Sequence, residues 1–160
     1  MELAAYVESQ YRKGGEKIMS TRCNIDFYTA YSTGKKKGKP ELVARIYKHF
    51  DGYPEEMVPL FKKFRKKMLT KYGDENEEAH GYGHMINNGE EIAAEFIKMF
   101  KPDYGDISVC ISLHKDIEYL YELYSNYGFN SVDNWKLKIY TINNWDNKGD
   151  KKLVETVELK

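Results

Sequence analysis

The amino-acid sequence predicts an α+β fold, in which a single antiparallel sheet of about five or six strands has two helices packed on one face. Three observations support this prediction. Several short segments alternate apolar and polar residues with the two-residue period of strands, and two longer segments repeat apolar residues at helical spacing. No repeat or linker divides the 160 residues, a length that suits one domain with a substantial core.

The strands are predicted from alternation and from residue type. Alternation is clearest in Ile107–Leu113, where apolar residues occupy every second position. Ile117–Tyr124 fits a helix or a strand by periodicity, but its three tyrosines and its short length favour a strand. The segments expected to form the sheet are Asn24–Ser32, Leu42–Phe50, Ile107–Leu113, Ile117–Tyr124, Trp135–Ile142 and Leu153–Leu159.

The first helix is expected over Glu56–Tyr72, with apolar residues along one face and cations along the other. Pro59 fits this helix only within its first turn, where a missing N–H group costs nothing. Asn88 and Glu91 form a capping-box-like pattern that begins a second helix, and Pro102 ends it. The cationic face, which we interpret as solvated, consists of Lys62, Lys63, Arg65, Lys66, Lys67 and Lys71.

Residues 1–18 are predicted to be an upstream extension, and residues 19–160 a single α+β domain. The segment RKGGEKIM, residues 12–19, permits codons that contain a purine-rich ribosome-binding sequence just before the ATG codon of Met19. The alternative is a short amphipathic helix, Leu3–Tyr11, joined to the domain through two consecutive glycines. In either case we expect this segment to pack weakly.

Charge and hydropathy argue against several classes of partner. Lys+Arg and Asp+Glu number 25 each, so the basic excess typical of duplex nucleic-acid binders is absent. No apolar run approaches the roughly 20 residues of a membrane helix, and no signal peptide is evident. We therefore expect a cytoplasmic protein without membrane contact. Cys23 and Cys110 lack metal-ligand spacing, and we expect neither a metal ion nor a cofactor.

The best candidate for a site is the stretch RIYKHFDGYPE, which begins at Arg45. On a strand, Arg45, Tyr47 and His49 fall on one face, opposite the expected helices. Asp51 and Tyr53 follow, beside the start of the first helix, where free N–H groups attract anions. This arrangement suits a small anionic ligand, and a tyrosine ring could stack on a base.

A structural interpretation of the same stretch stays open. Arg45 then pairs with a cross-strand acid such as Asp26, Asp51 caps the turn, and His49 bonds a backbone carbonyl. The sequence HGYGH places His80 and His84 in a polar loop whose glycines disfavour a metal-binding helix, which leaves a plain loop or a lid.

Two motifs resemble a family of small, uncharacterised phage and prophage proteins. These proteins begin with Met-Ser-Thr-Arg, as does Met19 to Arg22, and later show Tyr-basic-His-x-Asp-Gly-Tyr-Pro, as at residues 47–54. The resemblance spans about residues 19–124 and implies roles for five residues. Glu56 departs from it, because family members often have glycine there. The residues to which the resemblance extends are Arg22, Tyr47, His49, Asp51 and Tyr53.

The function expected first is that of a non-enzymatic phage or prophage accessory protein. It would bind a small anionic, nucleotide-like ligand near Arg22, Arg45, His49 and the helix start at Pro54. Such a protein could act against host defence by sequestering a signal molecule. The second hypothesis is a phosphodiesterase-like hydrolase that uses His49 and Asp51. The third is an interaction module that binds a host protein through a sheet face rich in tyrosine, of which the chain has 14. A homo-oligomer is compatible with each hypothesis.

Overall fold

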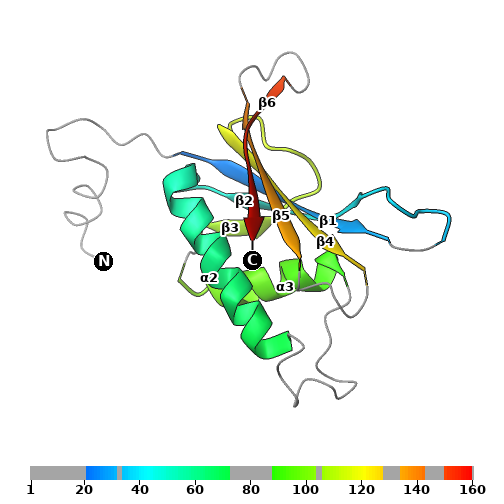
Figure 1. Cartoon of the computed structure of the whole chain (residues 1–160). Helices are drawn as coiled ribbons and strands as arrows, with labels where there is room; N and C mark the ends of the chain where they lie inside the picture. Colours follow the sequence, from blue (N-terminus) through cyan, green and yellow to red (C-terminus); the bar gives the residue numbers. More distant parts are fainter. Residues whose placement is uncertain are drawn as a thin grey trace, which may run out of the picture.

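In the computed structural model, the residues that the structure describes contain six strands and two helices (Figure 1). The predicted extension 1–18 and the HGYGH segment lie outside these residues, which are 21–31, 34–72, 88–103, 106–127, 134–142 and 150–159. In chain order the elements are β1 (Cys23–Ala30), β2 (Glu41–Lys48), α2 (Pro54–Tyr72), α3 (Gly89–Phe100), β3 (Ile107–Val109), β4 (Tyr119–Asn126), β5 (Trp135–Ile142) and β6 (Lys151–Leu159).

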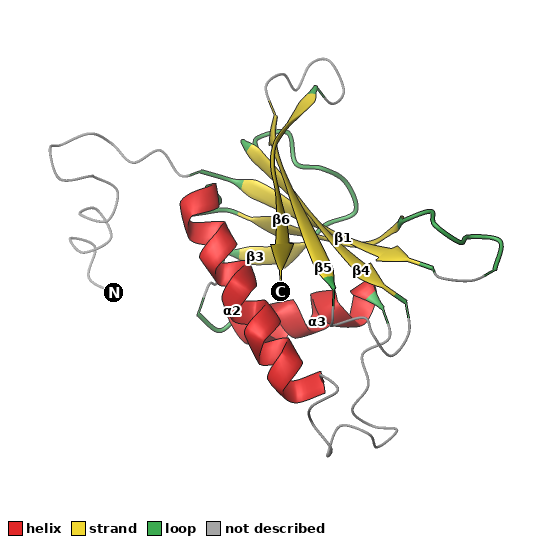
Figure 2. Ribbon diagram, in the orientation of Figure 1, coloured by secondary structure: helices red, strands yellow, loops and turns green. Residues whose placement is uncertain are grey.

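The strands form one sheet in the order β3-β2-β1-β4-β5-β6 (Figure 2). The predicted α+β class, the strand number and the two helices are confirmed. The sheet is mixed rather than wholly antiparallel, because β1 and β4 at its centre pair in parallel. The chain leaves β1 through β2, α2, α3 and β3, and this long crossover returns β4 to the other side of β1 in the same direction.

Both helices lie on the same face of the sheet, as predicted (Figures 1 and 2). Their aromatic side chains build the centre of the core around Phe96 of α3. Its ring lies 5.8 Å from Phe27 of β1, 5.2 Å from Phe64 of α2 and 4.7 Å from Phe100, as measured between centroids. Full burial of such a side chain contributes about 1.5–3 kcal/mol, so this cluster fixes the helices on the sheet.

Helix α2 buries the predicted apolar stripe but differs from the prediction at two residues. Arg65 is buried, with its guanidinium 5.5 Å from the ring centroid of Trp135, so it does not belong to the solvated face. The helix begins at Pro54, which makes Pro59 its sixth residue and places it beyond the first turn. No helix among the described residues is long and apolar enough to span a membrane.

The predicted strand Ile107–Leu113 is shorter than expected, because only Ile107–Val109 pairs with β2. Cys110 donates one more hydrogen bond, from its N–H to the carbonyl of Arg45, and the chain then leaves the sheet edge. Asn24 holds the following segment, because its Oδ1 accepts from the N–H of His114 at 2.9 Å. Alternation alone did not reveal that Ile111 is fully exposed.

Gly52, which follows β2, packs directly against Cys23 at the start of β1. A Cβ atom at Gly52 would lie 2.9 Å from the Cys23 Cβ and 3.0 Å from its Sγ. The backbone of Gly52 is also bonded on both sides, to the Thr21 carbonyl and to the Tyr121 hydroxyl. The turn between β2 and α2 therefore has no room for a larger residue.

We predict that Gly52→Ala lowers the free energy of unfolding by about 1–3 kcal/mol, because the added methyl overpacks a rigid contact. Urea denaturation measures the loss. Gly34→Ala serves as the comparison: the glycine has a φ of 80° but no atom within 4 Å of the added Cβ, so only backbone strain changes. A Gly52→Ala variant that is as stable as the parent protein would contradict the packing argument.

Candidate functional site

Five side chains from separate parts of the chain meet on the helix-free side of the sheet. Arg22 precedes β1, Tyr47 lies in β2, and His49 follows β2. His114 and Asp116 lie in the connection between β3 and β4. We call this group the Tyr47 cluster.

The Tyr47 hydroxyl is the centre of the Tyr47 cluster. It lies 3.0 Å from the His49 Nδ1 and donates to the Asp116 Oδ2 at 3.2 Å. The Tyr47 and His114 rings stack with their centroids 3.8 Å apart and their planes inclined by 14°. The Arg22 Nε pairs with the Asp116 Oδ2 at 3.3 Å. Arg22 and Tyr47 therefore share one carboxylate oxygen, the Oδ2 of Asp116.

The hydrogen bonds of Tyr47 also assign the proton on His49. A phenol has one hydrogen, and Tyr47 gives it to Asp116, so the His49 Nδ1 must donate to the phenol oxygen. Burial and the neighbouring carboxylate of Asp116 raise the pKa of Tyr47 to about 12, which keeps this hydrogen in place at neutral pH.

Arg45 does not join the Tyr47 cluster. Its guanidinium bonds both carboxylate oxygens of Asp26, across the β1–β2 pair, at 2.6 and 2.7 Å. The alternative interpretation of Arg45, in which it pairs with the cross-strand acid Asp26, is therefore correct. Burial raises the pKa of Asp26, while the bond to Arg45 opposes that rise and the charge of Glu122, its neighbour on β4, adds to it.

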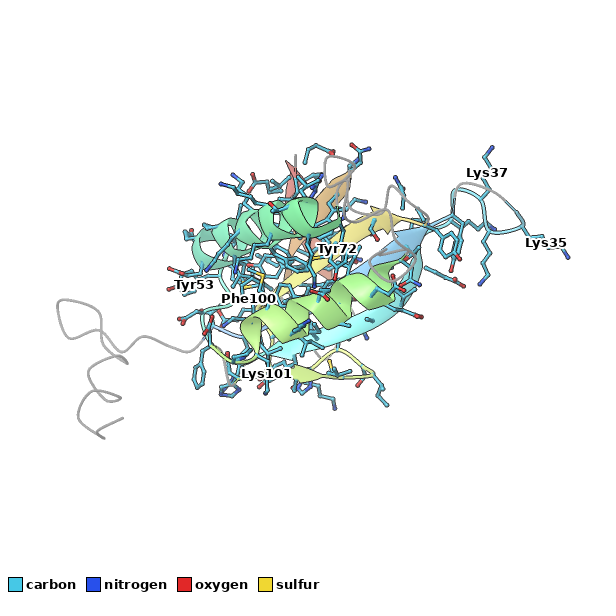
Figure 3. All side chains as sticks on the ribbon, turned by 90° about the horizontal axis from the view of Figure 1, so that it is seen from below. Lys35, Lys37, Tyr53, Tyr72, Phe100 and Lys101 are labelled. Atoms are coloured by element: carbon cyan, nitrogen blue, oxygen red, sulfur yellow. The ribbon has the colours of Figure 1, made fainter. Side chains whose placement is uncertain are left out.

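Asp51 and Tyr53 lie apart from the cluster, at the start of α2, where the structure places a cavity of about 250 Å³ (Figure 3 labels Tyr53 and Phe100). Asp51 lines this cavity in a left-handed conformation, with a φ of 52°. Strand β2 already ends at Lys48, so Asp51 does not continue the strand face that carries Tyr47. The charged residues described in its wall are two lysines and two acids: Lys48, Lys63, Asp51 and Glu56. Their charges balance, and no residue of the Tyr47 cluster lines this cavity.

Lys48 is a buried cation that the sequence analysis did not single out. Its side chain is 1% exposed, and its ammonium bonds the Phe50 carbonyl and pairs with the Asp106 Oδ2 at 3.3 Å. The pair fixes the end of β2 against the turn before β3. We assign Lys48 a structural role, because its charge is already matched.

The sequence placed Arg22, Tyr47 and His49 in the site, and the structure brings these three together. It also adds His114 and Asp116, which lie outside the motifs that predicted the site. The local pattern contained no signal for them, since the hydrogen bond from Tyr47 to Asp116 spans 69 residues of sequence. Among the described residues no group of three or more His, Cys, Asp or Glu could hold a metal ion, and His80 and His84 lie outside them.

The fold and this site define an α+β protein with a six-stranded mixed sheet and a polar cluster on its helix-free side. Comparison with known proteins gives no match to a family model, to a curated protein or to a solved structure.

We predict that Arg45→Met lowers stability by about 3 kcal/mol at neutral pH, because it leaves the buried Asp26 carboxylate without its cation. The pKa of Asp26 is already above its unfolded value, so its contribution to stability is complete at low pH and is lost as pH rises. Without Arg45 this loss grows. The deficit should therefore be larger at neutral pH than at about pH 4.

Urea denaturation at the two pH values measures this dependence. Lys136→Met is the matched control, because it breaks a lysine–glutamate pair, with Glu158, in which both side chains are about half exposed. A deficit in Arg45→Met that does not depend on pH would argue against an ionised Asp26 as its cause.

We also predict that the protein loses stability above about pH 10, where tyrosines of an unfolded chain ionise. Burial raises the pKa values of Tyr28, Tyr47 and Tyr140 to about 12, and those of Tyr121 and Tyr124 further. Because the folded state holds these protons more tightly, stability is complete below the unfolded pKa and falls as pH rises through the folded values. A titration of tyrosinate absorbance should show a late phase that coincides with loss of circular dichroism. The late phase should be absent in urea.

Proposed function

We propose that this chain is a phage- or prophage-type accessory protein that binds a small anionic, nucleotide-like ligand at the Tyr47 cluster and does not convert it. One observation carries the proposal. Arg22, His49 and His114 gather around a single aromatic side chain with one carboxylate, Asp116, among them.

The cluster has the components that such a ligand requires. The guanidinium of Arg22 suits phosphate geometry, and its side chain is 35% exposed. The half-buried ring of His114, which stacks on the buried ring of Tyr47, offers an aromatic surface beside Arg22. The proposed site therefore keeps Arg22, Tyr47 and His49 from the sequence prediction and adds His114 and Asp116.

The proposal of a phage or prophage protein rests on two motifs, Met-Ser-Thr-Arg and His-x-Asp-Gly-Tyr-Pro, which resemble those of small phage and prophage proteins. In that setting the protein would work in the cytoplasm of a bacterial host. A ligand that is bound and not converted is a sequestered ligand, and sequestration of a nucleotide signal is one way to act against host defence.

A hydrolase that uses His49 is the second candidate, and a specific observation favours it. The chain of hydrogen bonds from Asp116 through Tyr47 to the His49 Nδ1 orients the imidazole and leaves Nε2 with the lone pair in the neutral ring. An oriented imidazole of this kind can act as a general base. In this hydrolase Tyr47 and Asp116 would take the orienting role that the sequence analysis gave to Asp51.

Binding of adenosine monophosphate, cyclic adenosine monophosphate and inorganic phosphate tests the proposal, with calorimetry as the measurement. We predict that Arg22→Ala and His49→Ala each weaken nucleotide binding by about tenfold or more, because each removes a hydrogen bond to a charged group. Lys67→Ala, which removes a cation from the exposed face of α2, should leave the affinity unchanged.

The same proteins, assayed for turnover of a phosphodiester such as bis(p-nitrophenyl) phosphate, separate the two candidate functions. Binding without turnover supports the accessory protein. Turnover that is lost in His49→Ala while binding persists supports the hydrolase. If none of the three probes binds, or if Lys67→Ala weakens binding as much as Arg22→Ala, the site assignment is wrong.

A further inference from the structure

A second cavity, of about 360 Å³, lies on the helix-free face, where β1 and β4 end beside the start of β5 and the end of β6. Ala30 of β1 pairs with Asn126 of β4, so the small alanine leaves space at this corner of the sheet. The cavity is distinct from the Tyr47 cluster, which lies at the opposite end of β1. Its volume is within the range of small-molecule sites.

The aromatic wall of this cavity is Tyr124, and its position is fixed by two contacts. Its hydroxyl donates to the Glu122 Oε2 at 2.6 Å, and its ring stacks on Tyr28 with 4.8 Å between centroids. Glu122 is itself almost fully buried and bonded by the Lys151 ammonium at 2.6 Å. A ring held in this way is preorganised and loses little freedom when a ligand packs against it.

The charge of the cavity is positive. Lys136 and Lys138 are two residues apart on β5, so they lie on the same face, about 7 Å apart along the strand. Glu158 pairs with Lys136 at 3.2 Å, but both side chains are about half exposed, and such pairs contribute little. The Lys138 ammonium lies 4.8 Å from the Tyr124 ring centroid.

The remaining polar groups suit hydroxyls. Asn126 ends β4, Asn134 precedes β5, and each carboxamide supplies both donors and an acceptor. Lysines for a phosphate and carboxamides for sugar hydroxyls are therefore combined in one cavity, beside the edge of the Tyr124 ring. We propose that this cavity binds a sugar phosphate, either as a free sugar phosphate or as the ribose phosphate of a nucleotide.

The proposal is tested with ribose 5-phosphate, adenosine monophosphate and inorganic phosphate, each titrated into the whole chain while backbone amide resonances are recorded. Shifts should centre on Asn126 and Lys136. Lys138→Ala should weaken binding of the sugar phosphate about tenfold. Lys67→Ala on α2 is the control for loss of a surface cation, and Tyr124→Leu removes the ring while keeping the strand apolar.

Each outcome decides the proposal. If ribose 5-phosphate and adenosine monophosphate both bind, the cavity recognises the ribose phosphate that they share. If only one of them binds, that result shows whether the ligand is a free sugar phosphate or a nucleotide. Equal affinity for inorganic phosphate, or no effect of Tyr124→Leu, overturns the sugar phosphate as the ligand. Shifts that centre on Tyr47 overturn the second site and support the first. Conversely, His49→Ala should leave binding at Lys138 intact, so failure at one site is distinguishable from failure at the other.

Discussion

The parallel pairing of β1 and β4 is the constraint on which the rest of the structure depends. A parallel neighbour can be reached only by a crossover, and here the crossover contains β2, both described helices and β3. The pairing also places Asp26 directly beside Glu122, with both carboxylates almost fully buried. Two cations are therefore required on the same face, and Arg45 and Lys151 occupy those positions.

The two faces of the sheet bury different kinds of side chain. The helix face is a conventional apolar core, in which phenylalanine rings from sheet and helices interlock. The other face has no helix among the described residues and must cover buried charge with side chains alone. Tyrosine suits this task, because its ring excludes water while its hydroxyl satisfies a carboxylate, as Tyr124 does for Glu122. The high tyrosine content thus has a structural cause, and the same rings form the walls of both proposed sites.

Local patterns predicted the elements but not their arrangement. Alternation identified most of each strand, and the stripe that includes Phe61 and Phe64 identified α2, because these signals lie within one element. The parallel register of β1 and β4 could not be predicted, since it joins segments about a hundred residues apart. The site residues, too, were predictable only where they are close together in the sequence. Tyr47 and His49 were found because they are neighbours in sequence, whereas Asp116 reaches them only through the fold.

The ion pair between Lys151 and Glu122 links the edge of the sheet to its middle. Lys151 is the first residue of the edge strand β6, and Glu122 lies in β4, with β5 between them. An edge strand ordinarily frays by itself, at little cost to its neighbours. Here, detachment of β6 would strip the cation from a carboxylate that lies beside Asp26. Local opening of β6 therefore leaves the buried Glu122 carboxylate without its cation, and this electrostatic cost couples β6 to β4 and β5.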